Sequence, residues 1–113
     1  MADVKIYQAK CTQSFAFDKN AMQYKSAKED FTLSLVIDQE RNKAYTKGSV
    51  GQSELIIAST QQNGVTLLEK VLEGIVVYHA NIREKKLFIS KTYDFPFNTA
   101  HDSVILTIVC DLN

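Results

Sequence analysis

The sequence lacks an excess of charge of either sign, because 13 Lys and Arg residues are matched by 13 Asp and Glu residues in a chain of 113 residues. A chain without net charge has no overall field that attracts polyanions, which disfavours nucleic acid as its main partner. No continuous apolar run approaches the ~20 residues that a membrane-spanning helix needs. We therefore expect neither a nucleic-acid partner nor a membrane span.

A secretion signal is also missing, since the first residues do not show a basic segment followed by an apolar one. As the sequence stands, this predicts a cytoplasmic protein. If a signal peptide has been removed, the same sequence would belong to a periplasmic or secreted protein.

The residues that build catalytic and metal centres are scarce. His79 is expected to face outward from a strand and His101 lies in a polar loop, and neither is close in sequence to a cysteine. A hydrolytic site needs a nucleophile, a base and a group that orients the base. With four glycines, the chain contains no glycine-rich phosphate loop. We predict no catalytic residues, no metal and no cofactor, which disfavours an enzyme without excluding one.

Only two cysteines occur, Cys11 and Cys110, near opposite ends of the chain. One interpretation is two small buried side chains, a common state of free cysteine. The other is a disulfide, which would close most of the chain into a loop and stabilise the fold by about 4.7 kcal/mol in the chain-entropy model. Both cysteines share the inward faces of their predicted strands, as a bridge requires.

What the sequence does contain is hydrophobic alternation with a period of two. From Phe31 to Asp38, apolar residues alternate with mostly polar ones, which is typical of a strand with one buried face. Residues 4–12 and 104–111 show similar alternation. Phe15 and Phe17 continue the alternation of residues 4–12 after a bend, so we expect both rings in the core.

Turn residues separate the apolar runs. The pair Asn63-Gly64 favours a two-residue type I′ hairpin turn that joins 53–62 to 65–72. Gly74 indicates a further reversal before the next strand. Two segments stay open: 65–76 also has apolar residues at helical spacing, and 20–30 is either a short helix or a loop followed by a strand.

About eight short strands in sequence order predict an all-β, antiparallel up-and-down meander that closes into a small barrel. Closure is favoured because it removes exposed strand edges. The whole chain, 1–113, is then a single domain. The alternatives are a β-sandwich, or an α+β fold with a helix near 65–76.

Residues 31–110 resemble small bacterial meander β-barrel proteins of the lipocalin-like type, many of them uncharacterised. The resemblance rests on a strand that ends in Ile37-Asp38, on a turn over 81–87, and on a cysteine near each end of the chain. A lysine stands in the turn where those proteins carry glycine. The resemblance implies the fold and says little about activity.

The predicted barrel favours a non-catalytic binding protein that holds a small apolar or amphipathic ligand in or at the mouth of the barrel. Phe95 and Phe97 flank Pro96 in a predicted loop, where they either plug the barrel end or form a recognition patch. We predict Phe95, Phe97, Tyr78 and His101 as ligand-binding residues. The alternative function is a protein–protein interaction module: a regulator, an inhibitor or a homo-oligomer.

Overall fold

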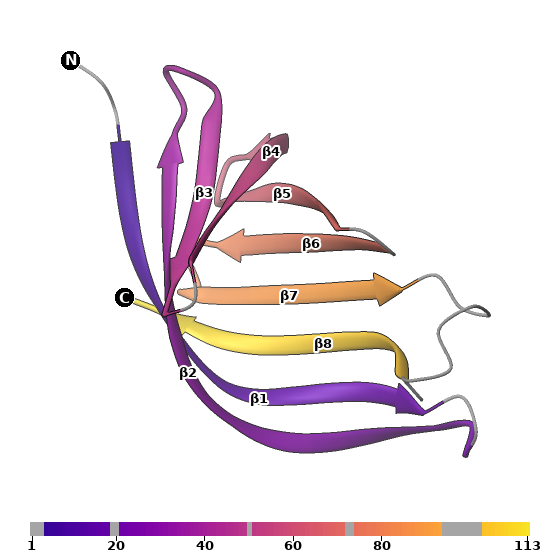
Figure 1. Ribbon diagram of the computed structural model, residues 1–113. Helices are drawn as coiled ribbons and strands as arrows, with labels where there is room; N and C mark the ends of the chain where they lie inside the picture. The colour runs from indigo at the N-terminus through magenta and orange to yellow at the C-terminus, as the bar shows by residue number, and fades with distance from the viewer. Residues whose placement is uncertain (1–3, 19–20, 50, 72–73, 94–102) are drawn as a thin grey trace.

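Eight strands follow one another along the chain, and each pairs antiparallel with the next (Figure 1). They are β1 (Val4–Asp18), β2 (Gln23–Asp38), β3 (Lys43–Gly48), β4 (Gly51–Gln61), β5 (Gly64–Val71), β6 (Gly74–Asn81), β7 (Lys86–Tyr93) and β8 (Ser103–Leu112). β1 also pairs with β8, so the meander closes into a barrel, as predicted. This computed structural model describes residues 4–18, 21–49, 51–71, 74–93 and 103–113.

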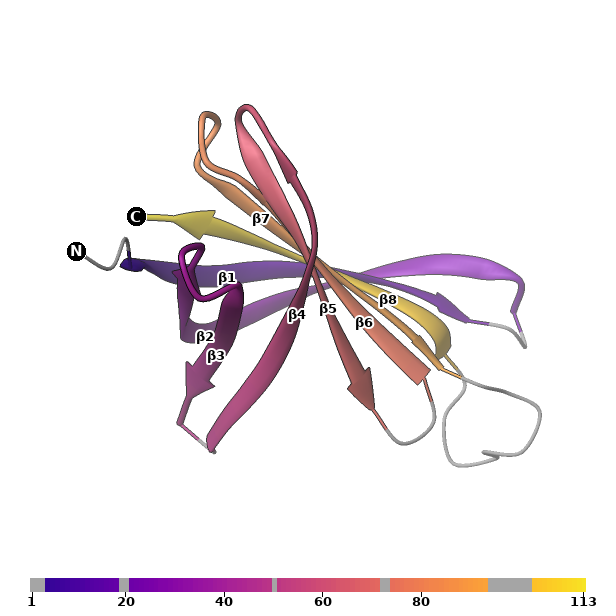
Figure 2. The same ribbon diagram turned by 90° about the horizontal axis from the view of Figure 1, so that it is seen from above.

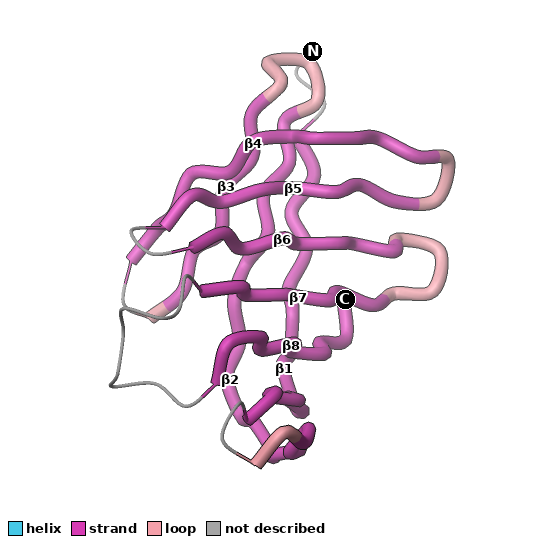
Figure 3. The backbone as a smooth tube through the Cα atoms, turned by 90° about the vertical axis from the view of Figure 1, so that its right-hand side faces the viewer, coloured by secondary structure: helices cyan, strands magenta, loops and turns pink. Residues whose placement is uncertain are grey.

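Within those ranges the chain forms strands and turns, as the tube view shows (Figure 3). The helix considered for 65–76 does not form, because β5 extends to Val71 and β6 begins at Gly74. Of the two readings of 20–30, the strand is correct from Gln23 onward. The described residues include no helix with the length and apolar character needed to cross a bilayer.

Strands β1, β2 and β4 bend so that the barrel can close. The pairing of β1 shifts between Cys11 and Gln13, and the pairing of β4 shifts between Ile57 and Ser59. Such bulges turn a strand from one sheet direction to another. The start of β1 and all of β3 therefore run roughly across the direction of β5 to β8, and β1 and β2 curve from one direction into the other (Figures 1 and 2).

The bulge in β1 also reverses which side chains face inward. Ser14 pairs with the core residue Ile108 and is only 4% exposed, whereas Phe15 pairs with Thr107 on the outer surface. Phe17 contacts Tyr24 there, with ring centroids 5.0 Å apart. The prediction that Phe15 and Phe17 lie in the core is wrong, because one extra residue changes the face of every later side chain.

The middle of the barrel is filled with side chains. The largest of the side chains that are less than 2% exposed are Leu35, Leu67, Leu87, Cys11 and Cys110. Small residues such as Ala9, Ala44 and Ala80 lie among them and let opposite walls approach. The centre of the barrel is therefore packed and does not form an open ligand cavity.

A disulfide joins Cys11 and Cys110, which pair directly across β1 and β8. Their Cα atoms are 3.9 Å apart, and both residues are fully buried. The bond therefore links, inside the core, the two strands whose pairing closes the barrel.

The β4–β5 hairpin differs from the predicted one. Gln61 pairs with Gly64, so Gln62 and Asn63 are the turn residues and Gly64 begins β5. A Cβ atom at position 64 would lie 2.3 Å from the carbonyl oxygen of Ala80. Glycine is required here by the close approach of β6, which is a different reason from the positive φ of a type I′ turn.

Three other turns share one construction. In each, an Asp or Asn side chain accepts a hydrogen bond from the backbone N–H three residues later, and the residue that follows this donor has a positive φ. The pairs are Asp18 with Met22 (φ 54°), Asp38 with Asn42 (φ 55°) and Asn81 with Lys85 (φ 56°).

Candidate functional site: the mouth of the barrel

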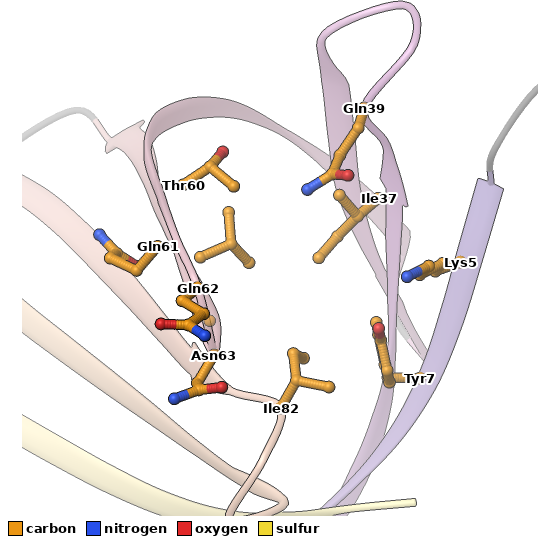
Figure 4. Close-up of a pocket in the computed structure, with 11 residues that line it drawn as sticks. Lys5, Tyr7, Ile37, Gln39, Thr60, Gln61, Gln62, Asn63 and Ile82 are labelled. Atoms are coloured by element: carbon orange, nitrogen blue, oxygen red, sulfur yellow. The ribbon is translucent and has the colours of Figure 1, made fainter.

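A cavity of about 300 Å³ lies at one end of the barrel (Figure 4). We call it the mouth cavity. It is formed by the start of β1, by the β2–β3, β4–β5 and β6–β7 turns, and by the adjoining strand ends. Its lining residues are Lys5, Tyr7, Ile37, Gln39, Thr60, Gln61, Gln62, Asn63, Gly64, Val65 and Ile82.

The cavity exists because β1 extends beyond its partner on one side. Pairing between β1 and β8 begins at Ala9, and the backbone N–H of Asn113 donates to the carbonyl of Gln8 over 2.9 Å. Before Gln8, β1 pairs only with β2 among the described strands. The wall is open along this segment, and the cavity lies beside it.

The bulge in β4 places Thr60 in the lining. Ser59 pairs with Thr66 on the outer surface, while Thr60 pairs with the buried Val65. Without the extra residue at Ala58, the inward and outward positions of the last part of β4 would be exchanged. Thr60 is exposed and faces the cavity, so it marks one side of the opening.

The floor of the mouth cavity is apolar. Ile37 and Val65 are 4% and 3% exposed, and half-buried Ile82 and Tyr7 continue this surface toward the opening. Figure 4 shows the Ile37 and Ile82 side chains directed into the space between the strands. This surface can take the apolar part of a small molecule out of water.

The opening is polar. Gln39, Gln62 and Asn63 are exposed, and within the described part of the chain their side-chain amides make no hydrogen bond. The amide nitrogen of Gln61, by contrast, donates to Ser59 over 2.7 Å on the outer surface. Three amide groups at the opening can therefore both donate to and accept from a ligand.

One cation faces these amides. Among the described residues that line the cavity, Lys5 alone carries a formal charge. Its amine points toward the cavity from the β1 side in Figure 4, with the hydroxyl of Tyr7 below it. The arrangement gives the opening a positive side and an uncharged, hydrogen-bonding side.

Two turns are fastened together at the opening. The carbonyl of Asn63 accepts hydrogen bonds from the backbone N–H groups of Ile82, over 2.8 Å, and Arg83, over 3.4 Å. The β4–β5 and β6–β7 turns therefore keep a fixed separation, which preorganises this side of the cavity.

Tyr78 lies elsewhere in the interior. It is 6% exposed, and its hydroxyl donates to Oε1 of Glu69 over 2.8 Å. Burial raises the pKa of Tyr78 above the ordinary value, the hydrogen bond and negative charge of Glu69 raise it further, and a hydrogen bond with Thr46 acts in the opposite direction. Tyr78 therefore stays protonated at neutral pH and holds a polar pair in the barrel.

Of the four predicted ligand-binding residues, Tyr78 alone lies in the described part of the chain. Tyr78 is not among the residues that line the mouth cavity. Phe95, Phe97 and His101 lie outside the described residues. Sequence reasoning missed Lys5, Gln39 and the Gln61-Gln62-Asn63 run. The usable signal was topological, since alternate turns of a meander lie at the same end of the sheet and bring 39, 62–63 and 82 together.

No metal centre is formed by the described residues, which contain no group of three His, Cys, Asp or Glu side chains placed to hold an ion. His79 is exposed on the outer surface, where its Nδ1 lies 3.0 Å from Oγ1 of Thr66.

The chain matches no protein-family model, no curated protein and no solved structure. Its function is therefore argued from the geometry of the mouth cavity.

Proposed function

We propose that the protein is a non-catalytic binding protein that holds a small amphipathic ligand in the mouth cavity. The observation that carries this proposal is the combination of an apolar floor, around Ile37 and Val65, with side-chain amides at the opening that make no hydrogen bond within the described residues. Ligand sites in proteins are commonly apolar hollows with a few polar groups that fix orientation.

The size of the cavity limits the ligand. About 300 Å³ is at the lower end of the ~300–1,000 Å³ range of small-molecule sites, and the filled centre behind Val65 prevents deeper entry. The ligand is therefore no larger than two or three rings, or a short chain, bound at the end of the barrel with its polar part toward solvent.

The charge at the opening determines which polar head group the ligand carries. Lys5 favours an anionic head group, since an ammonium and a carboxylate or sulfonate attract each other and share hydrogen bonds. Gln39 and Gln62 supply additional donors to the same head. Because Lys5 is exposed, its attraction is weakened by water and salt, so we expect it to tune affinity and not to create it.

The test uses 1-anilinonaphthalene-8-sulfonate, an aromatic anion whose fluorescence rises in apolar surroundings. We expect saturable binding to one site per chain. A Thr60→Trp variant should abolish it, because the indole fills the cavity. Ser59→Trp is the matched control, since residue 59 faces the outer surface and the same ring there should leave binding unchanged.

The neutral analogue N-phenyl-1-naphthylamine distinguishes binding to the apolar floor from attraction by the charge of Lys5. Lys5→Gln should weaken binding of the anion by about twofold to fivefold and leave the neutral probe unaffected. Binding of neither probe to the wild-type protein, or equal binding to the Thr60→Trp and wild-type proteins, would refute the proposal.

A further inference from the structure

A large part of the outer surface carries no formal charge. It consists of the outward positions of β6, β7, β8 and the second half of β1, which lie side by side (Figure 1). Three rows of directly paired residues cross these strands, and one of them runs Phe15, Thr107, Ser90, Val77. The twelve positions in these rows include no Asp, Glu, Lys or Arg. We call them the uncharged face.

The uncharged face is apolar as well as uncharged. Phe88, Ile105 and Ile75 are 38%, 37% and 38% exposed, although each is a large hydrophobic residue. Phe17 and Val109 lie beside them, half-buried. Singly exposed apolar residues are ordinary, but a contiguous patch over four strands marks an interaction surface.

The outer surface of β3 does not share this character. The outward positions of β3 are Lys43, Tyr45 and Lys47, and Glu54 pairs with Tyr45 from β4. A sheet exposed to water on one side usually alternates apolar residues with such polar ones. The uncharged face departs from that pattern, and a partner would explain the difference.

We infer that the partner is a second copy of this chain, packed sheet on sheet about a two-fold axis. In a two-fold interface the same patch meets itself, so a charged residue near the axis would lie close to its own copy and therefore to the same charge. The uncharged face has none, and it is therefore compatible with its own copy. Sheets pack face to face through such apolar rows.

The available area suits a weak, concentration-dependent dimer. The four strands of the uncharged face, spaced by ~4.8 Å, and its three rows, spaced by ~6.7 Å, cover roughly 20 by 20 Å before side-chain relief is added. Leu68 of β5 and Ile56 of β4 extend the middle row, and Ile56 is 58% exposed, whereas the row that contains Ile75 ends at Lys70. This is about half of the ~800 Å² of accessible surface that each partner buries in a standard interface, a size typical of weak association.

Analytical ultracentrifugation of the full chain tests the inference. We expect a concentration-dependent dimer for the wild-type protein. Phe88→Asp should raise the dissociation constant about 100-fold or more, because it sets carboxylates within the interface. Ile105→Lys, on another row and of opposite charge, should do the same. Circular dichroism on each variant checks that the strands are retained.

Ile6→Asp is the matched control, since Ile6 is 62% exposed but lies at the start of β1, which pairs with β2 and not with β8 and is outside the uncharged face. It should leave the dimer intact. A wild-type monomer at all concentrations would overturn the inference, as would a monomer that floats with phosphatidylcholine vesicles, which would make lipid the partner. A dimer lost in Ile6→Asp and kept in Phe88→Asp would assign association to the strand edge.

Discussion

Tyr78 on β6 donates its phenol hydrogen to Oε1 of Glu69 on β5 over 2.8 Å, inside a barrel whose other central side chains are mostly apolar. Removing the hydroxyl leaves the carboxylate without this donor. We expect Tyr78→Phe to lower the free energy of unfolding by about 1–3 kcal/mol, measured by urea denaturation. Tyr45→Phe is the control, because Tyr45 is on the outer surface of β3 and should change stability by less than about 0.5 kcal/mol. Equal effects would contradict the role of the pair.

The same tyrosine predicts a pH dependence. Burial and Glu69 raise the pKa of Tyr78 in the folded protein, whereas the unfolded chain titrates near ~10. Above about pH 10 the unfolded state has lost the proton and the folded state has kept it, so stability falls as pH rises, by about 1.4 kcal/mol per pH unit from this group. Below that pH the contribution is complete. Denaturation of wild-type and Tyr78→Phe proteins at several alkaline pH values should show a steeper loss in the wild type, and parallel curves would contradict the prediction.

Gly64 provides a steric test of the strand register. A methyl group there would meet the carbonyl oxygen of Ala80 at 2.3 Å, so the β5 and β6 backbones would have to separate. We expect Gly64→Ala to destabilise the protein by about 1–3 kcal/mol in chemical denaturation. Gly48→Ala is the control, since nothing lies within 4 Å of the Cβ position there. A neutral Gly64→Ala variant would show that this register is wrong.

The β6–β7 turn predicts a stabilising substitution. Lys85 has a φ of 56°, a conformation that costs a residue with a side chain more than it costs glycine. We expect Lys85→Gly to raise the free energy of unfolding by about 0.5–1 kcal/mol, with a higher melting temperature by calorimetry. Glu84→Gly, one residue earlier, should lower it. Destabilisation by Lys85→Gly would mean that the turn has another geometry.

Much of the fold follows from local patterns. Alternation over 31–38 predicted a strand with one buried face, and Leu35 and Ile37 of this strand lie inside. Gly74 predicted a reversal before the next strand, and β6 begins there. The first signal works because a strand has a period of two.

The bulges were not predictable in the same way. An extra residue after Cys11 is favoured by closure of the barrel, a property of the whole sheet that no local pattern in β1 reports. The error in the facing of Phe15 and Phe17 followed from this, and it concealed the uncharged face. The predicted register of the β4–β5 hairpin was wrong for a related reason, since Gly64 is required by its contact with Ala80 and not by its own φ.

The mouth cavity depends even more on tertiary structure. Lys5, Gln39 and Gln62 are far apart in sequence and belong to a strand and two turns that ordinarily suggest exposed, solvated side chains. Only the closed meander makes them neighbours. Composition and motif searches therefore had no means of finding the cavity.

The most direct test of the account is a ¹H–¹⁵N correlation titration of the wild-type protein with 1-anilinonaphthalene-8-sulfonate. We predict that the backbone amide signals of Gln39, Gln62 and Val65 shift together and saturate with one dissociation constant. The signals of Leu87 in the filled centre and Phe88 on the uncharged face should stay in place. Saturable shifts centred on Phe88, or no saturable shift at the three mouth residues, would contradict the claim that the mouth of this barrel binds an amphipathic ligand.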